Sequence, residues 1–212
     1  MLLLGLKETV YMVFLSSFLS YVIGIPLGIL LVVTDRDGIQ PNIIVNTLLA
    51  IIINILRSVP FIIMLLAVLP ITRFIVRTTL GPSAVVVPLV IAASPYIARM
   101  VESSLKEMNA GIVEAAKSMG ASNFQIIWKV MLPESMPSLL TGAAISITTI
   151  LGYSTMAGFV GGGGLGTLAI NYGYYRYRMD VMMVTVVVLV IIVQLIQEFF
   201  LFLSRRADKR AR

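Results

Sequence analysis

The chain has 212 residues, is 58% hydrophobic and 12% charged, and carries a net charge of +6. Soluble domains have roughly 45–50% apolar and about 25% charged residues, so this composition indicates an integral membrane protein. Its basic residues lie mostly beside apolar segments, where we expect them to set topology and contact membrane lipid, with no role in binding nucleic acid. Because the chain has no cysteine and no histidine, disulfides, thiol nucleophiles, histidine bases and zinc sites are excluded, and we expect no catalytic residue and no metal.

Five apolar segments predict five transmembrane helices in one all-α domain, 1–212. The first, 9–33, has 25 residues without a charge. As a helix it would be about 37 Å long, enough to cross a hydrocarbon core of about 30 Å with some tilt. The uncharged part of the third segment is short, so its helix must continue past Arg99 to reach water. The other four predicted spans are about 43–69, 83–101, 136–160 and 181–203.

The second span is interrupted near its middle by Arg57, Ser58 and Pro60. A central arginine costs about 2.5–3.5 kcal/mol on insertion scales and usually faces protein or water. Pro60 removes one N–H and disturbs bonding to the carbonyl of Leu56, which would break the helix. One hypothesis is that these three residues line or gate a translocation pathway. The alternative is that the span ends sooner and that Arg57 snorkels or braces neighbouring helices.

Lysine and arginine accumulate on the cytoplasmic side of membrane proteins, and this bias predicts the orientation of the chain. The basic C-terminal tail is therefore expected inside, together with Arg36 and the basic residues that follow the third span. The N-terminus is then outside and the C-terminus cytoplasmic. The tail residues are Arg205, Arg206, Lys209, Arg210 and Arg212, and those after the third span are Arg99, Lys106, Lys117 and Lys129.

A polar segment, about 109–133, separates the third and fourth spans and should be cytoplasmic. Its first part predicts a short amphipathic helix, because apolar residues recur at i, i+3, i+4 and i+7. Gly120 can end this helix in the left-handed region. The apolar stripe consists of Ile112, Ala115, Ala116 and Met119.

A second short helix is predicted to begin at Ser122, because Gln125 follows three residues later and completes the pattern of a capping box. Pro133 and Pro137 mark its end before the fourth span. A helical hairpin lying on the membrane surface, with Lys117 and Lys129 toward lipid headgroups, would also fit this pattern. The apolar stripe of the second helix consists of Phe124, Ile127, Trp128 and Met131.

The glycine-rich segment 161–166 formally satisfies a G-x-G-x-x-G pattern, but five glycines in six residues do so easily. No strand precedes it, no Lys-Ser/Thr follows it, and the topology places it outside the cell. We therefore interpret it as a flexible loop or a place of close backbone packing. Four tyrosines that follow it are expected to form an interfacial aromatic belt: Tyr172, Tyr174, Tyr175 and Tyr177.

The polar segment resembles the cytoplasmic loop signature of ABC importer permeases. That signature is Glu-Ala-Ala, three residues, Gly, nine residues, then a hydrophobic residue, one residue and Leu-Pro. Val130 stands where the family usually has isoleucine, which is a conservative change. The resemblance implies that the first helix is a coupling helix that docks on a separate ATPase subunit. The matching residues are Glu114, Ala115, Ala116, Gly120, Leu132 and Pro133, and Lys117 lies within the same helix.

The resemblance extends over essentially the whole chain toward the permeases of bacterial methionine importers. Three segments carry it: Asn54–Ile63, Pro95–Glu102, and Gly161–Gly166 leading to Tyr172-Gly173-Tyr174. It implies a second copy of this chain, two cytoplasmic ATPase subunits that bind MgATP, and an extracytoplasmic substrate-binding lipoprotein at the bacterial inner membrane. The chain itself would be a transport subunit with no enzymatic activity and no cofactor of its own.

Other functions remain open from the sequence. The chain could belong to an ABC importer for another amino acid or small solute. An ion-gradient-driven secondary transporter is less well supported, because the spans carry only one acidic residue, Glu198, and it lies near an end. A purely structural membrane subunit would leave the polar loop and Arg57 unexplained.

Overall fold

The computed structural model describes residues 1–208, and this part of the chain contains helices and no strand. Three residues of the predicted basic tail, Lys209, Arg210 and Arg212, lie outside the described residues. The helices are α1 (Leu2–Val33), α2 (Ile43–Ser58), α3 (Phe61–Ala67), α4 (Leu69–Val76), α5 (Pro82–Lys106), α6 (Ala110–Ser118), α7 (Asn123–Ile126), a π-helix (Ile127–Met131), α8 (Leu132–Glu134), α9 (Met136–Met156), a 3-10 turn (Ala157–Val160), α10 (Gly164–Leu168), a second π-helix (Ala169–Tyr174) and α11 (Met179–Ala207).

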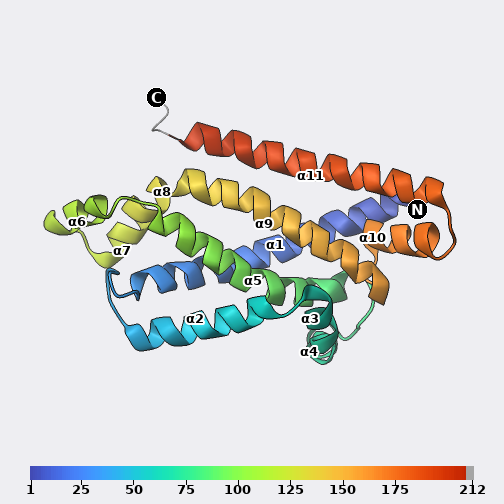
Figure 1. The fold of residues 1–212 in the computed structure, drawn as a ribbon, viewed down its shortest axis with the longest axis horizontal. Helices are drawn as coiled ribbons and strands as arrows, with labels where there is room; N and C mark the ends of the chain where they lie inside the picture. The colour runs from blue at the N-terminus through green and yellow to red at the C-terminus, as the bar shows by residue number, and fades with distance from the viewer. Residues whose placement is uncertain (209–212) are drawn as a thin grey trace.

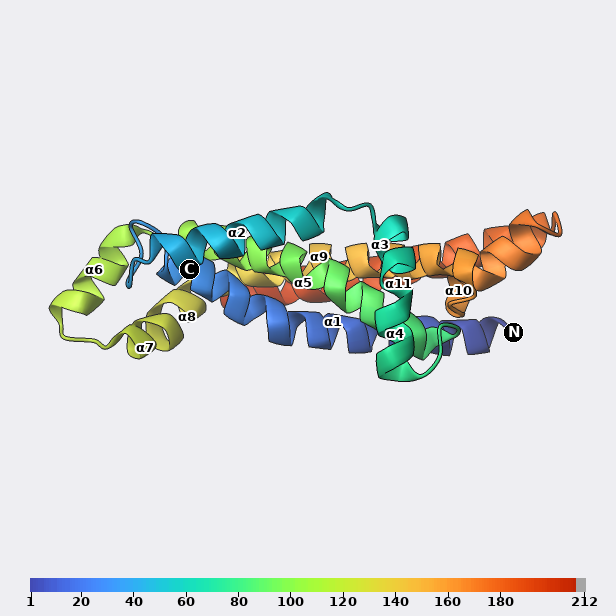
Figure 2. The same ribbon diagram turned by 90° about the horizontal axis from the view of Figure 1, so that it is seen from below.

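Long apolar helices run along one axis and form the body of the molecule (Figure 1). Within residues 1–208, four helices are long and apolar enough to cross a membrane, and a fifth crossing is formed if the bent pair α2 and α3 counts as one. The predicted all-α membrane fold is thus confirmed. Helices α6 and α7 extend beyond one end of the bundle, the end where α11 also finishes, and the N-terminus lies at the other (Figures 1 and 2). We call these the loop end and the N-terminal end.

The helix bounds differ from the predicted spans mainly at the first two segments. Helix α1 begins at Leu2 instead of Thr9, because the adjacent Lys7 and Glu8 are accommodated within it. The second segment does not run straight to Leu69: α2 ends at Ser58, and α3 turns away by 101°. Helix α5 continues past Arg99 to Lys106, α9 with its 3-10 turn covers Met136–Val160, and α11 extends to both sides of the predicted 181–203.

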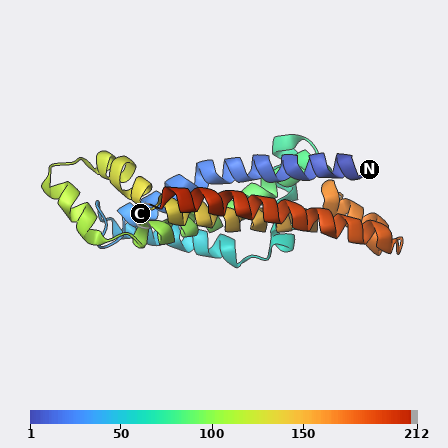
Figure 3. The ribbon, with the colours of Figure 1, turned by 90° about the horizontal axis from the view of Figure 1, so that it is seen from above.

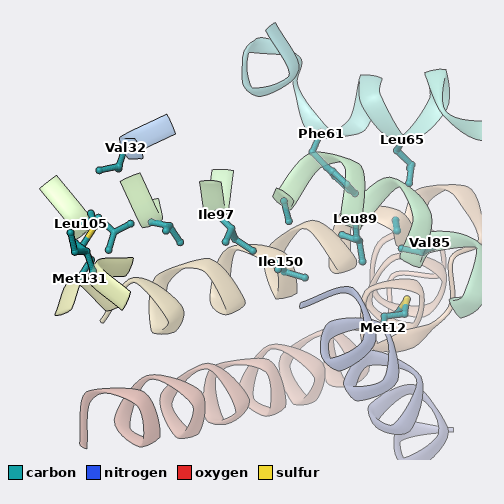
Figure 4. Packing of buried hydrophobic residues seen from close by; sticks show 14 of the residues in the cluster. Met12, Val32, Phe61, Leu65, Val85, Leu89, Ile97, Leu105, Met131 and Ile150 are labelled. Atoms are coloured by element: carbon teal, nitrogen blue, oxygen red, sulfur yellow. The ribbon is translucent and has the colours of Figure 1, made fainter. Parts of the chain in front are cut away.

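Helix α5 is the centre of the bundle and packs closely on α1. Its side chains Leu89, Ile97 and Val101 are 0% exposed. Gly28 of α1 faces α5, where a Cβ atom would lie 2.6 Å from the carbonyl oxygen of Ala98. Small residues allow such close approach of two helices in a membrane, where dispersion contacts replace the hydrophobic effect as the driving force. Buried side chains from α1, α3, α5, α9 and the loop end form one continuous core around these residues (Figure 4).

Candidate functional site

Helix α6 is delimited at both ends by local hydrogen bonds. At its start, the side chain of Asn109 accepts a hydrogen bond from the backbone N–H of Gly111 at 2.9 Å. At its end, Gly120 has φ = +80°, and two backbone N–H groups bond back into the last turn: Gly120 to the Lys117 carbonyl at 2.9 Å and Ala121 to the Ala116 carbonyl at 3.1 Å. This is a Schellman motif, which requires the left-handed conformation that glycine adopts without cost. The predicted role of Gly120 as the helix terminator is confirmed.

The capping box predicted at Ser122 is present. The backbone N–H of Ser122 donates to the Gln125 side chain at 2.9 Å, and the N–H of Gln125 donates to Ser122 Oγ at 3.4 Å. The second helix ends between Pro133 and Pro137, as predicted. It passes from four α-helical residues into the π-helix and then into α8, which ends at Glu134. A π-helical segment shifts each hydrogen bond by one residue, so the helix absorbs a proline that has no N–H to donate.

The apolar stripes predicted for the two loop helices do not face the protein core as a unit. In α6 only Ala116 is buried, whereas Ile112, Ala115 and Met119 are exposed, Met119 by 82%. In the second stripe Met131 is buried, but Phe124 and Trp128 are 70% and 57% exposed. The fully buried anchor is Ile126, which the predicted stripe omitted. The loop therefore packs on the bundle through Ala116, Ile126 and Met131 and leaves much of the apolar side of both helices exposed.

The exposed side of the loop is therefore a mixed surface suited to a protein partner. It combines apolar side chains with the charged groups of Glu114 and Lys117, which are also exposed. Large exposed apolar patches rimmed by polar groups mark interaction sites. Figure 3 shows that the helices of this loop project past the ends of the long helices, where a partner can approach them. Leu132 is half-buried and Pro133 is exposed where the loop joins α9.

The three residues predicted to interrupt the second span lie at the bend between α2 and α3. Arg57 is in the last turn of α2, and Ser58 Oγ donates to the Asn54 carbonyl at 2.8 Å. Pro60 is extended and serves as the N-cap residue of α3. Arg57 is exposed and has no hydrogen bond or ion pair within residues 1–208. A membrane arginine with no partner in its own chain needs water or a second chain beside it.

Helices α3 and α4 cross the bundle and carry an unpartnered apolar face. One side, including Phe61, Leu65 and Val68, is buried against the bundle. The opposite side is apolar and exposed at the spacing of a single helical stripe. Its members with their exposed fractions are Ile63 54%, Leu66 47%, Ile71 50%, Phe74 84% and Ile75 60%. The sequence predicted the break in this segment but ended the span at about residue 69, so Ile71, Phe74 and Ile75 were not assigned to a helix.

A chain of charges ties α5 to α2 and to the end of α1, and it was not recognised from the sequence. Arg99 donates to Glu102 at 2.6 Å and to the side chain of Asn54 in α2 at 3.0 Å. Lys106 bridges Glu102 at 3.0 Å and Asp35 at 2.6 Å. The spacing of Arg99, Glu102 and Lys106 at i, i+3 and i+7 was the available signal. The network fixes the α1–α2 turn to the last turns of α5, from which the loop emerges.

The pKa of Asp35 is lowered below its ordinary value of 3.8, first by the hydrogen bond from Lys106 and then by the backbone N–H of Arg36. The carboxylate is therefore charged at neutral pH. Asp35 lies in the turn after α1, outside the spanning helices. Its ion pair is about one-third exposed on the aspartate side, so solvent weakens it.

At the N-terminal end, α10 starts against α1. The backbone N–H of Gly164 donates to Glu8 Oε2 at 2.7 Å, and the N–H of Leu165 donates to Thr9 Oγ1 at 2.9 Å. These bonds join residues 156 positions apart and cap the helix that follows the glycine-rich segment. The segment is thus a place of close backbone packing, as one of the two interpretations held. Tyr174, Tyr175 and Tyr177 are exposed near it.

No group of acidic residues within positions 1–208 has the geometry to hold a metal ion. The arrangement is suited to transmitting movement. The protruding loop follows the last turns of α5, and the bend between α2 and α3 carries an exposed arginine, Arg57.

Residues 12–212 match the family described as binding-protein-dependent transport system inner membrane component. A protein of Vibrio cholerae named "Probable D-methionine transport system permease protein MetI" is 47% identical over 99% of this chain and 93% of its own length. The Escherichia coli K12 protein named "D-methionine transport system permease protein MetI" is 47% identical over 74% of this chain and 73% of its own length. A solved structure described as inward-facing conformations of the MetNI methionine ABC transporter superposes with a TM-score of 0.97 at 45% identity, covering 98% of this chain and 96% of that one.

Proposed function

Because this chain belongs to the binding-protein-dependent transport system inner membrane components, and within them to the permeases of methionine ABC transporters, we propose that it is the membrane subunit of an ATP-driven methionine importer. The observation that carries the proposal is the protruding loop, with its Schellman turn at Gly120 and its exposed apolar and charged side chains. An exposed surface of this kind is explained if a partner protein docks on it. An ATPase subunit that docks there and closes on MgATP would move the loop.

The coupling surface consists of α6 and the start of the second loop helix. Glu114, Ala115 and Lys117 face outward for contact with the ATPase, whereas Ala116 anchors α6 to the core. Gly120 sets the angle between the two short helices, and Leu132 with Pro133 connects the second one to α9. Movement of the docked ATPase would thereby tilt α5 and α9 together, as rigid helices moving about short connections.

The loop end is cytoplasmic in this proposal, and the N-terminus is outside. The support is the excess of lysine and arginine at that end, where Arg36, Lys106, Lys117, Lys129, Arg205 and Arg206 lie. MgATP would then bind in the cytoplasmic partner. An extracytoplasmic binding lipoprotein would deliver the solute at the N-terminal end.

Two copies of the chain would enclose the pathway. The unpartnered apolar face of α3 and α4 supports this arrangement, because it crosses the bundle beside the bend that carries Arg57. Contact between two such faces would close the pathway on the outer side and leave Arg57 to face the enclosed space. In that position its guanidinium could meet the carboxylate of an amino acid.

The direct test is methionine uptake into proteoliposomes that contain the permease with its co-purified ATPase. We expect uptake to require ATP and the binding protein, and to be competed by methionine more strongly than by other amino acids. Uptake driven by an ion gradient without ATP would contradict the proposal. Equal competition by unrelated amino acids would leave the assignment as an ABC importer intact but would contradict methionine as its specific solute.

Arg57 can be tested by the substitution Arg57→Gln in the same assay. If the arginine faces the pathway, uptake falls while the complex still assembles and hydrolyses ATP. The matched control is Arg36→Gln in the turn after α1, which should transport normally. Wild-type uptake by Arg57→Gln would remove the pathway role.

The contact between copies can be tested by disulfide cross-linking, since the chain has no cysteine of its own. We expect Phe74→Cys to form a cross-linked pair of permeases in the assembled complex. Val187→Cys, exposed on α11, serves as the control and should not. The reverse pattern would place the dimer interface on α11 and contradict the arrangement.

A further inference from the structure

A long apolar groove lies between α1 and α11, with α9 as its floor. Both helices pack on α9, and they run along the bundle on the same side (Figure 3). The groove has a volume of about 1120 Å³. It begins near Val10 and Leu151 in the body of the bundle and reaches Trp128 and Ala207 at the loop end.

The lining of the groove is unsuited to the transported solute. No charged side chain is among its described lining residues. Of its polar groups, Tyr21 is engaged with Ser146 at 2.6 Å, Thr9 accepts the bond from Leu165, and the buried Ser17 hydroxyl has no partner. A zwitterionic amino acid would lose the hydration of two charged groups there and meet no charged partner, at a cost of several kcal/mol. An acyl chain has no polar groups, so it would lose no hydrogen bonds on entering the groove.

One wall of the groove is α11, whose surface is largely exposed and apolar. In α11 only Thr185 and Ser204 are buried, and its outward face carries exposed aliphatic and aromatic side chains such as Val187, Ile191 and Leu195. The groove opens beside this face, so a lipid chain can enter it sideways.

Basic residues stand at the loop end of the groove. Lys129 follows the lining residue Trp128, and Arg205 and Arg206 precede the lining residue Ala207; all three are exposed. The Arg206 guanidinium lies 4.5 Å from the centre of the Phe202 ring. Glu134 and Asp208 lie near the same end, and both are already engaged with neighbouring groups. The three basic side chains outnumber the two carboxylates at this end of the groove, so the local charge favours binding of an anion.

We propose that this groove binds one anionic phospholipid of the inner leaflet, with an acyl chain between α1 and α11 and its phosphate at Lys129, Arg205 and Arg206. Basic pockets between membrane helices on the cytoplasmic side recognise anionic headgroups, and tryptophan prefers this depth. Because Trp128, Leu132 and Pro133 belong to the coupling loop and also line the groove, the lipid would brace the loop against α9. The inference goes beyond transport and rests on the proposed orientation.

The test uses Trp128, the only tryptophan of the chain, as a reporter. The complete complex of permease and ATPase is placed in phosphatidylcholine nanodiscs, and brominated phosphatidylglycerol or brominated phosphatidylcholine is added in steps. Bromine on an acyl chain quenches tryptophan on contact. A Trp128→Phe complex gives the background from the ATPase.

We expect phosphatidylglycerol to half-quench Trp128 at a mole fraction about fivefold or more below that of phosphatidylcholine, since each basic residue favours an anionic lipid by about that factor. Arg205→Gln should reduce the preference about fivefold, and Arg205→Lys should preserve it. Ser17→Phe, which fills the groove from α1, should weaken quenching by phosphatidylglycerol, whereas Val22→Phe on the exposed side of α1 should not.

Equal quenching by both lipids, unchanged by Arg205→Gln and Ser17→Phe, would mean ordinary bulk lipid and overturn the proposal. Absence of quenching by either lipid would mean that protein, such as a second copy of the chain, covers the groove, and would overturn it as well. Neither readout depends on methionine uptake, so failure of the lipid site is distinguishable from failure of the transport function.

Discussion

At the loop end a glycine follows the end of α6, and at the N-terminal end a glycine begins α10, but these two helix boundaries are held by different parts of the chain. At the loop end, Gly120 and the Ser122 capping box are fixed by hydrogen bonds between residues at most five positions apart. At the N-terminal end, Gly164 and Leu165 are held by Glu8 and Thr9. A unit with local bonds keeps its shape while it moves as a body, whereas a long-range clamp holds two helices to each other. The local bonds of the loop end therefore suit a segment that moves as a rigid body and transmits motion, which we call the lever. The long-range bonds of the N-terminal end suit a part of the bundle that stays fixed.

The largest effect is expected at Gly120. A residue with a side chain pays about 1–2 kcal/mol in the left-handed region, and a β-branched one pays more. For Gly120→Val we expect methionine uptake and coupled ATP hydrolysis to fall about tenfold or more, with membrane insertion unchanged. Gly111→Ala, on the same helix but without a positive φ, is the matched control and should retain activity. Normal coupling by Gly120→Val would mean that the turn does not set the docking geometry.

The clamp at the N-terminal end should show its effect in stability. Glu8→Ala removes a hydrogen bond from a charged acceptor at the start of α10 and should destabilise the purified complex by about 1.5–3 kcal/mol. A lowered melting temperature by scanning fluorimetry would show it, with Lys7→Ala as the neighbouring control. If Glu8→Ala instead uncouples ATP hydrolysis from uptake at unchanged stability, the contrast between lever and fixed end is wrong.

The capping box offers a milder change within the loop. Ser122→Ala removes the side-chain acceptor for the Gln125 N–H and should cost about 1 kcal/mol of helix stability. Coupled activity should fall less than for Gly120→Val, and Ser122→Asn should restore it because asparagine is an equally good N-cap residue. An effect as large as that of Gly120→Val would mean that the Ser122 capping box matters as much for coupling as the turn at Gly120.

The smallest effect concerns Asp35 and pH. Because its folded pKa is lowered, the ion pair with Lys106 stabilises the fold above the ordinary pKa of 3.8, and this contribution disappears as the pH falls through the lowered value. Asp35→Asn should therefore slightly lower the melting temperature at neutral pH and match the wild type once the pH falls below the lowered pKa. If the melting temperatures of Asp35→Asn and the wild type still differ in acid, Asp35 contributes to stability through packing and not through its charge.

Much of the fold was predictable because its signals are local. Long uncharged runs gave the spanning helices, and the glycine and Ser122-Gln125 patterns gave the loop turn and cap. The rest was not predictable, because a stripe of apolar residues shows that a helix has an apolar side but not whether that side meets core, lipid or a partner. The sequence therefore did not decide where Ile112, Met119 and Phe124 face, and the structure leaves them exposed.

The sequence by itself determined a helical membrane protein with a polar loop of two short helices and a break after Arg57, because composition, proline and glycine act within a few residues. Only the tertiary structure decided that α3 turns across the bundle, that Glu8 and Thr9 hold α10, that Arg99 reaches Asn54, and that α1 and α11 leave an apolar groove at the loop. These features join residues far apart in the chain, and their free energy comes from packing, which no local pattern encodes.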